Sequence, residues 1–540
     1  MKRVAVIGAG ASGLPAIKCC LDEGLQPVCF ERTDDIGGLW NYTPDVREGQ
    51  GSVMKSTITN TSKEMTTYSD FPPPRGFPMY PHNRQMLQYF RMYADKFGLR
   101  PYIRFKTEIV SVKPVQEEKE SKWTVVSKDG STGKLTTETF DNVMVCCGHY
   151  KDKFVPNVPG QNAFQGKLIH SHDYRDFHGF EDKKVVVVGI GNSGGDAAVE
   201  LSRVASKVYL STRDGRYILG RISEAGMPVD MIHLTRFRRG ALSYLPRSLI
   251  ETLYLKKLNQ TVNHQAYCLE TDSGPFAKGV LVNDELPSRI ACGSIVIKAG
   301  VKRLHKTSVE FDDGTTECDV DVILLATGYT FDYPFLHSSV HGLSANRNTL
   351  YKFMFPPVST QPTICVIGLI QAAGPSPPMA EMQARLALAV FKGKVKLPSV
   401  ELQQADIEKT RSRLKKVFSD SKGHFFTVDY MVYMDELASL FGCKPALVKM
   451  FLTDTKLAWL CLFGACTPYQ YRLEGPGKWS GAREAILQQW DRTLAPLQTR
   501  PTTRKQNSSN IIIVMKVSVV FIGLYYLYSK YALKNLDQVI

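Results

Sequence analysis

The stretch VAVIGAGASG, residues 4–13, decides the fold of this chain. Its four leading apolar residues predict a buried parallel strand, and the glycines that follow have the spacing GxGxxG. In such a turn Gly8 permits the tight bend, Gly10 lets the backbone approach a pyrophosphate, and Gly13 lets the next helix pack on the strand. The phosphates then lie at the helix N-terminus, which favours negative charge. The stretch therefore predicts a dinucleotide-binding unit.

An acidic residue ends the second strand of this unit. After a helix expected to run to about Glu23, the stretch PVCFER (27–32) places Glu31 eighteen residues beyond Gly13. A carboxylate at this point accepts hydrogen bonds from ribose hydroxyls and repels a 2′-phosphate, so the first site suits FAD. The candidate cofactor-binding residues of this unit are Gly8, Ala9, Gly10, Ala11, Ser12, Gly13 and Glu31.

A second copy of the unit begins at KKVVVVGIGNSGGDAAVEL (183–201). Its second strand, VYLST (208–212), ends without a carboxylate, and Arg213 follows. A guanidinium can hold a 2′-phosphate through two hydrogen bonds, so this site favours NADPH; the alternative is an exposed arginine at a strand end. The candidate cofactor-binding residues here are Gly189, Gly191, Ser193, Gly194, Gly195, Asp196 and Arg213.

Two later strands indicate how the units are connected. NVMVCCGH (142–149) and DVILLATGY (321–329) are apolar and run into a glycine, as expected where a chain passes between two dinucleotide domains close to a cofactor. The predicted fold is therefore α/β, with two Rossmann-like dinucleotide-binding domains, the NADPH domain being inserted in the FAD domain. The predicted parts are the FAD domain (1–155 and 331–445), the NADPH domain (156–212 and 296–330), a basic helical insertion (213–295), a C-terminal region with linker (446–510) and a transmembrane tail (511–528).

Composition narrows the class of protein. The 540 residues are 43% hydrophobic and 22% charged, which is typical of a globular chain. The net charge of +15 comes without zinc-finger spacing or an aromatic RNA-binding signature, so anionic cofactors and a membrane surface explain it better than nucleic acid. The twelve cysteines form no CxxC and no metal-ligand cluster. We therefore expect reduced cytosolic thiols, no bound metal, and no disulfide reductase, although such enzymes also carry tandem dinucleotide domains.

The C-terminal stretch IIIVMKVSVVFIGLYYLY (511–528) is almost unbrokenly apolar, with Lys516 as its only charge. Eighteen residues of helix reach about 27 Å, enough for a thin bilayer. The stretch follows the polar segment PTTRKQNSSN (501–510), which is typical of a linker. We predict a membrane anchor; the alternative, a buried core helix, would need a partner surface.

The segment MIHLTRFRRGALSYLPRSLIETLYLKKLNQ (231–260) alternates apolar and basic residues. Basic residues beside an apolar helical stripe suit the headgroup layer of a membrane. Apolar substrates could then enter from the bilayer. An equal alternative is a solvated helical insertion that covers the NADPH domain.

The stretch FQGKLIHSHDYR (164–175) carries the pattern FxGxxxHxxxY, and at this point the chain resembles flavin-containing monooxygenases. The resemblance implies a structural or domain-coupling part for the stretch, and no catalytic role for His170. Other similar stretches are ERTDDIGGLW (31–40), TNTSKEM (59–65), IGLIQ (367–371) and PYQYRLEGPGKWSGAR (468–483).

The resemblance also implies further site residues. Asn60 is placed by the flavin ring and the nicotinamide, and it is the expected catalytic residue because its amide can donate a hydrogen bond without offering a titratable proton. The remaining cofactor-binding residues implied are Leu39, Trp40, Thr59, Thr61 and Gln371.

The reaction implied is hydride transfer from NADPH to FAD, addition of O₂ to give a C4a-hydroperoxyflavin, and oxygen transfer to nucleophilic nitrogen or sulfur. The substrates would be small apolar xenobiotics or metabolites. Baeyer–Villiger oxygenation of ketones, an NADPH oxidase that produces hydrogen peroxide, and a non-enzymatic NADPH sensor stay open. The resemblance places the protein on the endoplasmic reticulum membrane, anchored at its C-terminus with the catalytic part in the cytosol. Whether it forms a homo-oligomer also stays open.

Overall fold

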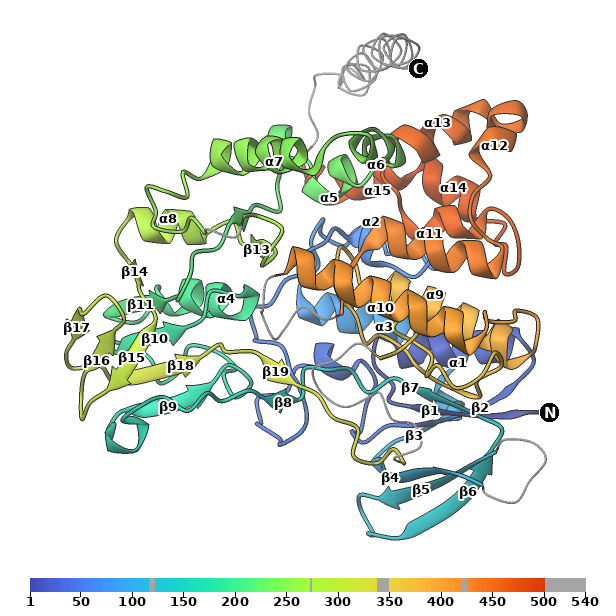
Figure 1. The fold of residues 1–540 in the computed structure, drawn as a ribbon, viewed down its shortest axis with the longest axis horizontal. Coiled ribbons are helices and arrows are strands. Elements are labelled where there is room, and N and C mark those ends of the chain that lie inside the picture. The colour runs from blue at the N-terminus through green and yellow to red at the C-terminus, as the bar shows by residue number, and fades with distance from the viewer. Residues whose placement is uncertain (116–121, 272–273, 338–348, 419–425, 501–540) are drawn as a thin grey trace.

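The computed structural model describes residues 1–115, 122–271, 274–337, 349–418 and 426–500. Within these residues the chain forms two large parallel sheets, each with helices against it and a smaller sheet beside it (Figure 1). The α/β class predicted from the sequence is therefore confirmed.

The first large sheet contains the strand that begins the chain. Strand β1 (Arg3–Ile7) pairs in parallel with β2 (Gln26–Phe30) on one side and with β7 (Asn142–Val145) on the other. Four of the five residues of β1 are buried, as expected of a strand whose sheet is covered on both faces. The strand order is β20 (Ile364–Val366), β7, β1, β2 and β3 (Ile103–Arg104).

The second large sheet repeats this arrangement. Strand β10 (Lys184–Val188) pairs in parallel with β11 (Lys207–Ser211), and α4 (Asn192–Leu201) connects them, as α1 (Gly13–Asp22) connects β1 to β2. The strand order is β14 (Ile295–Lys298), β11, β10, β18 (Val322–Leu325) and β9 (Lys167–His170).

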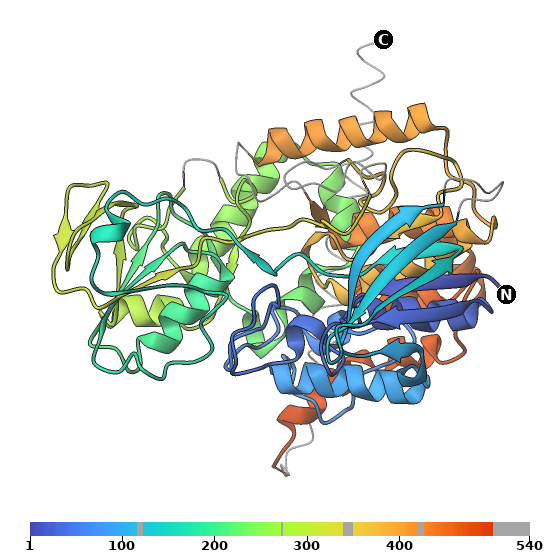
Figure 2. The same ribbon diagram turned by 90° about the horizontal axis from the view of Figure 1, so that it is seen from below.

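Two connections join the large sheets. The chain leaves the first sheet after β7 and returns to it at β20, and all strands of the second sheet lie between these two in the sequence. On the way, β8 (Asp152–Lys153) pairs antiparallel with β19 (Tyr329–Thr330). Figure 2 shows the two connecting segments running together between the sheets.

The other strands form smaller sheets. An antiparallel sheet beside the first large sheet consists of β4 (Thr107–Pro114), β5 (Trp123–Asp129) and β6 (Leu135–Phe140). The remaining strands are β15 (Val301–Leu304), β16 (Val309–Phe311) and β17 (Thr316–Glu317), the pair β12 (Ile218–Leu219) and β13 (Leu281–Val282), and the pair β21 (Gln371–Ala373) and β22 (Thr427–Asp429).

Helix α9 (Pro377–Phe391) lies at the centre of the larger core, because every one of its residues is buried. It packs against α1 on one side and against α11 (Tyr430–Phe441) on another. The other helices in this part of the molecule are α2 (Lys63–Thr66), α3 (Asn83–Lys96) and α10 (Val400–Val417).

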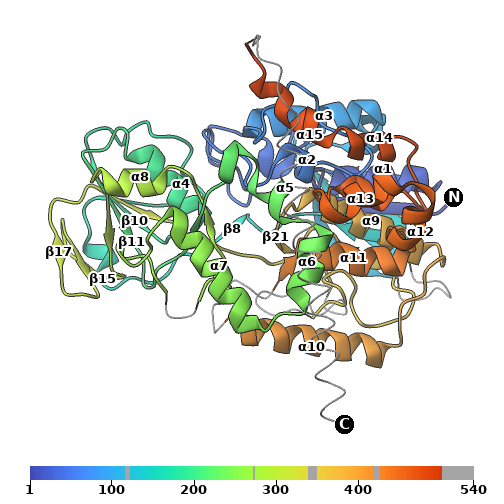
Figure 3. The same ribbon diagram turned by 90° about the horizontal axis from the view of Figure 1, so that it is seen from above.

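The stretch in which apolar and basic residues alternate folds into helices. Thr235 caps the N-terminus of helix α6 (Arg236–Ser243), since its hydroxyl accepts a hydrogen bond from the N–H of Arg238. Figure 3 shows α6 beside α13 (Thr455–Phe463), with which it is in contact. The other helices of the insertion and of the C-terminal region are α5 (Val229–His233), α7 (Arg247–Thr261), α8 (Leu286–Ala291), α12 (Leu447–Thr453), α14 (Ala482–Leu487) and α15 (Gln489–Leu494).

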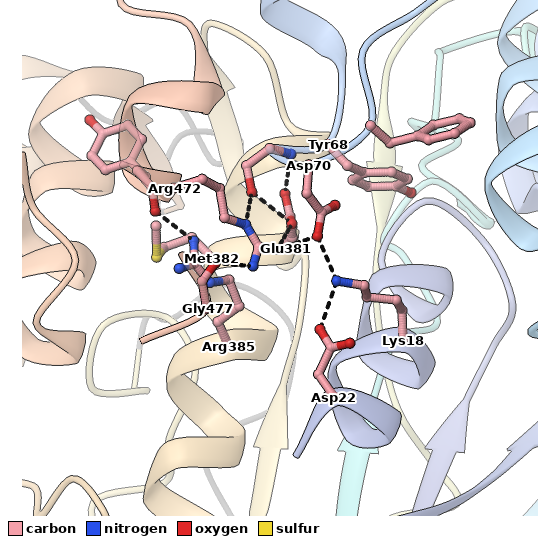
Figure 4. A network of polar contacts seen from close by, with 12 residues as sticks. Lys18, Asp22, Tyr68, Asp70, Glu381, Met382, Arg385, Arg472 and Gly477 are labelled. Carbon is pink, nitrogen blue, oxygen red and sulfur yellow. Dashed lines mark hydrogen bonds and ion pairs between the residues drawn. The ribbon is translucent and has the colours of Figure 1, made fainter. Parts of the chain in front are cut away.

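A buried polar network ties the C-terminal region to helices α1 and α9 (Figure 4). Glu381 of α9 accepts hydrogen bonds from the N–H and the hydroxyl of Ser69 and from Arg472, at 2.6, 2.8 and 2.6 Å. Asp70 lies 3.0 Å from Arg472 and 2.5 Å from Lys18 of α1. Lys18 also pairs with Asp22 at 2.7 Å, and Arg385 lies beside Glu381 in the same network. Three cations thus face three carboxylates, and this balance makes the charges tolerable in a core.

No helix in the described part of the chain is long and apolar enough to cross a membrane. The predicted tail, residues 511–528, lies outside the described residues. None of the twelve cysteines is in a disulfide, and eight of them are buried.

Candidate functional site

The first glycine turn has the conformation that its spacing predicts. Gly8 has a φ of +102°, which L side chains rarely adopt. A Cβ atom at Gly13 would lie 1.8 Å from the carbonyl oxygen of Gly8, so only glycine lets α1 pack this closely on β1. The turn is therefore closed to any larger residue at both positions.

The same turn leaves room for a phosphate. A Cβ atom at Gly10 would approach only Gly38, at 3.5 Å. The backbone N–H groups of Gly10, Ala11 and Ser12 donate to no other described residue, and Ala11 and Ser12 line a large cavity. Amide donors without partners at the start of a helix are what a pyrophosphate needs. The turn thus fits a dinucleotide.

Glu31 is buried directly after β2, next to this turn. Its carboxylate accepts hydrogen bonds from the N–H of Ala9 at 2.7 Å and from the N–H and hydroxyl of Thr33, both at 2.8 Å. These bonds fix the carboxylate at the strand end, where the sequence places a ribose. The contact with the ribose itself stays a prediction.

The second glycine turn repeats the geometry. Gly189 has a φ of +109°, and a Cβ atom at Gly194 would lie 1.9 Å from the carbonyl oxygen of Gly189. A Cβ atom at Gly191 would meet nothing within 4 Å, so the backbone there faces open space. A Cβ atom at Gly195 would lie 2.9 Å from the side chain of Leu281, so the helix packs closely on that residue.

Two predicted residues lie on α4 next to this turn. Ser193 and Asp196 both line the cavity. Asp196 accepts a hydrogen bond from the side-chain amide of Asn283 at 2.7 Å, and burial raises the pKa of its carboxyl to about 6. A carboxyl group with a raised pKa is protonated more easily, and in its neutral form it does not repel a nearby phosphate.

Arg213 is exposed, lines the cavity, and forms no ion pair within the described residues. Its guanidinium is therefore free to bind an anion. Sequence reasoning missed Arg216, which lines the same wall and has a buried Nε without a partner in the described chain. One of its terminal nitrogens donates to the carbonyl of Lys278 at 2.5 Å, and burial lowers its pKa. Nothing in the glycine motif signals this second arginine.

Asn60, with Thr59 and Thr61 beside it, lines the same cavity as the two turns. The loop is held from two sides by residues that no motif indicated. Arg221 donates to the side-chain oxygen of Asn60 at 2.8 Å and to the carbonyl of Thr59 at 3.0 Å. Asp230 accepts from the N–H of Ser62 at 2.6 Å, and burial raises its pKa to about 6.

The other predicted residues also reach this cavity. Leu39 and Trp40 form part of a short 3₁₀ helix (Gly38–Trp40), and both line the wall. Gln371 begins β21 and lines the wall too. The cavity has a volume of about 4200 Å³ and is also lined by residues of α5, α6 and α7. Seven predicted residues are not among those that line the wall, namely Gly8, Ala9, Gly10, Gly13, Glu31, Gly194 and Gly195.

His170 is buried at the end of β9 and does not line the cavity. Its Nδ1 accepts from the N–H of His172 at 3.0 Å, so Nε2 carries the hydrogen that faces the carbonyl of Gly328 at 3.1 Å. Burial lowers its pKa to about 4. The contact ties β9 to the returning connection between the sheets, which agrees with a structural role.

A model of the family described as Flavin-binding monooxygenase-like matches residues 1–530 of this chain. Flavin-containing monooxygenase 5 of Rattus norvegicus is 46% identical over 528 residues, which cover 97% of this chain and 98% of the relative. Dimethylaniline monooxygenase (N-oxide-forming) 2 of Cavia porcellus is 45% identical over 529 residues, with coverage of 97% and 98%.

Solved structures are similar as well. S-allyl-L-cysteine S-oxygenase from Allium sativum superposes with a TM-score of 0.61 at 25% identity, over 85% of this chain and 94% of that chain. Cyclohexanone monooxygenase with bound epsilon-caprolactone has a TM-score of 0.59 at 17% identity, over 81% of this chain and 97% of that chain. At such low identity the second similarity concerns the fold alone.

Proposed function

This chain belongs to the flavin-binding monooxygenase-like family and is an FAD-dependent NADPH monooxygenase, and from that premise we propose that it oxygenates nucleophilic nitrogen or sulfur in small apolar molecules. The names of two similar proteins support nitrogen and sulfur as the atoms that are oxygenated. One relative is described as forming N-oxides, and one solved structure is of an S-oxygenase. Both reactions transfer oxygen to an atom with a lone pair.

The observation that carries the proposal is one cavity that reaches both glycine turns and the amide of Asn60. When bound there, FAD supplies the oxygen chemistry and NADPH supplies the hydride. The chain has to hold both cofactors, to orient them and to keep water out. The first turn with Leu39 and Trp40 would hold FAD, and the second turn with Arg213 would hold NADPH. The oxygen-activating route expected from the family resemblance remains part of this proposal.

Asn60 would act as a fixed hydrogen-bond donor toward the reacting region. Its amide can donate a hydrogen bond but has no proton that titrates, so it would not transfer a proton in the reacting region. Apolar side chains of Met231, Ile232 and Leu234 line the same cavity. A dry wall of this kind favours oxygen transfer to a substrate over release of hydrogen peroxide.

We also propose the domain boundaries predicted from the sequence. The FAD domain (1–155 and 331–445) would contain the first large sheet, and the NADPH domain (156–212 and 296–330) the second. The insertion (213–295) would supply part of the cavity wall, and residues 446–510 would form the C-terminal region and linker. The division is supported by the strand order, since each large sheet takes its strands from one of these sets, apart from Ile295 at the start of β14.

A membrane location is part of the same proposal. Helix α7 exposes Leu249 by 43% and Lys256 beside it; Leu253, exposed by 48%, and Arg247 are exposed as well and also line the cavity. Helix α12 exposes Val448 and Leu452, and Figure 1 has α7 and α12 along the same edge of the molecule. Apolar residues between cations suit the headgroup layer of an endoplasmic reticulum membrane, and the tail would anchor the chain there.

The function is tested by offering the purified holoenzyme a thioether, a tertiary amine and an aliphatic ketone side by side. We expect NADPH-dependent sulfoxide and N-oxide, with little hydrogen peroxide. Ester from the ketone without sulfoxide would favour Baeyer–Villiger oxygenation. Hydrogen peroxide as the sole product would favour an NADPH oxidase.

The role of Asn60 is tested by Asn60→Ala and Asn60→Ser. We expect both variants to retain FAD, measured by its absorbance, and to lose about tenfold in oxygenated product per NADPH, the equivalent of one hydrogen bond. The missing product should be recovered as hydrogen peroxide. Unchanged coupling in both variants would contradict the assigned role.

A further inference from the structure

We propose that Arg221 is a positioning residue that fixes the amide of Asn60 with its oxygen toward the protein and its NH₂ group toward the cavity. The inference rests on the proposed function, because it concerns the residue expected to donate to the reacting region. It assigns this orientation to a side chain that lies 161 residues away in the sequence.

The orientation follows from the kinds of atoms involved. One terminal nitrogen of Arg221 lies 2.8 Å from the side chain of Asn60, and its Nε donates to the carbonyl of Thr59 at 3.0 Å. A guanidinium carries donors and no acceptor, so only the oxygen of the Asn60 amide can face it. The nitrogen of that amide must then point the other way. No described residue accepts a hydrogen bond from it, and Asn60 lines the cavity.

Arg221 is itself firmly held. Its side chain is buried, with 4% of the residue exposed. Its second terminal nitrogen and its backbone N–H donate to the two oxygens of Asp284, at 3.0 and 2.7 Å. Its carbonyl accepts a hydrogen bond from the hydroxyl of Tyr80. A buried cation with one carboxylate and two further oxygen acceptors is compensated in charge and fixed in direction.

The backbone on both sides of Asn60 is also held by hydrogen bonds. The N–H of Thr59 donates to the carbonyl of Pro81 at 2.9 Å. Asp230 accepts from the N–H of Ser62 at 2.6 Å. The backbone around Asn60 is thus clamped on both sides, and the remaining freedom is the rotation of its amide, which Arg221 removes.

The contact also connects the two nucleotide units. Asp284 lies two residues before α8, which packs against α4 of the second unit. Asn60 belongs to the part of the chain that builds the first unit. Through Arg221 the position of the second unit therefore acts on the amide that faces the cavity.

The test compares Arg221→Gln with Arg221→Lys in the holoenzyme. The amide of a glutamine can present either oxygen or nitrogen to Asn60, so the orientation is no longer enforced, whereas lysine carries donors alone. We expect Arg221→Gln to lose about tenfold in product per NADPH, as for one hydrogen bond, and Arg221→Lys to recover most of it. The KM for NADPH and the FAD content should change less than coupling does.

A spectroscopic measurement separates positioning from a structural role. Titration of the oxidised holoenzyme with NADP⁺ shifts the flavin absorbance if the Asn60 amide contacts the cofactors. Arg221→Gln and Asn60→Ala should change this difference spectrum alike, and the double variant should equal Asn60→Ala alone. Additive changes would overturn the proposal, since they would mean that Arg221 acts independently of Asn60.

Two more variants complete the test. Asn60→Asp keeps an acceptor for Arg221 and removes the donor, so it should match Asn60→Ala; normal coupling would overturn the proposal even if Arg221→Gln did not fold. Arg203→Gln is the matched control, because Arg203 is exposed and pairs with Glu285, next to Asp284. If the wild type oxygenated neither amine nor thioether, the proposed function would be wrong. The NADP⁺ titration would still show whether Arg221 acts through Asn60.

Discussion

At the scale of single residues, Arg213 is expected to decide between NADPH and NADH. It is exposed in the cavity wall without a described ion-pair partner. Arg213→Ala should weaken NADP⁺ binding about tenfold or more, because a charged hydrogen bond is lost, and leave NAD⁺ binding unchanged. Titration of the flavin absorbance with both nucleotides measures this ratio.

Arg303 is a suitable control, since it is exposed on β15 at a distance in sequence from the turn. Arg303→Ala should bind both nucleotides normally. An unchanged ratio in Arg213→Ala, together with an altered ratio in Arg216→Ala, would transfer the assignment to Arg216.

Asp230 predicts a dependence of stability on pH. Burial raises its pKa from 3.8 to about 6, so between these values the folded state binds more protons than the unfolded state. Stability should therefore fall as pH rises through this window. Asp230→Asn removes the effect. The free energy of unfolding of this variant, taken relative to that of the wild type, should therefore be higher at pH 7 than at pH 4, by at most about 3 kcal/mol.

The measurement is the unfolding free energy in urea from pH 4 to pH 8. Asp319→Asn, on an exposed turn, is the control and should follow the wild type. If the difference between Asp230→Asn and the wild type did not vary with pH, Asp230 would not be the titrating group.

At the scale of elements, the second glycine turn should be separable from the first. In Gly194→Ala the new Cβ atom would lie 1.9 Å from the carbonyl oxygen of Gly189, so α4 must move away from β10. We expect NADP⁺ binding to be lost while FAD is retained, because the first turn lies on another sheet. Flavin absorbance measures the bound FAD, and titration with NADP⁺ measures NADP⁺ binding.

Gly240 in α6 offers the matched control, since a Cβ atom there meets nothing within 4 Å. Gly240→Ala should bind both cofactors and gain about 0.5–1 kcal/mol in stability. Loss of FAD in Gly194→Ala would contradict the independence of the two turns.

The helices of the insertion predict a membrane contact in addition to the one proposed for the tail. Protein lacking residues 505–540 should still sediment with anionic vesicles, and the added changes Leu249→Ser and Leu253→Ser should weaken this binding about tenfold or more. Leu135→Ser is the control, because Leu135 is exposed on β6. Complete release of the truncated protein would leave the insertion no part in anchoring.

At the scale of the whole molecule, the buried network of Figure 4 should control stability. Glu381 is 1% exposed, and Glu381→Gln leaves the cation of Arg472 short of a carboxylate. The expected loss is about 3–5 kcal/mol in unfolding free energy, measured with denaturant. Glu138→Gln, which breaks a pair with the half-exposed Arg104, should cost about 1 kcal/mol or less. Equal losses would contradict the role of the buried network.

The sequence by itself determined the two dinucleotide units. Each depends on a glycine spacing within a few residues and on an apolar strand just before it, so local sterics are sufficient. The strands around VAVI and VVVV, and the glycines with positive φ at Gly8 and Gly189, lie where the sequence predicts them. The tail at 511–528 stays a prediction, because it lies outside the described residues.

The tertiary structure alone decided what surrounds Asn60. Arg221 and Asp230 reach its loop across 161 and 168 residues, and Ser69 meets Glu381 across 312. Such contacts join single side chains from segments that have no shared period or spacing. They arise when two sheets and their helices pack together, and a local pattern of residues therefore contains no signal for them.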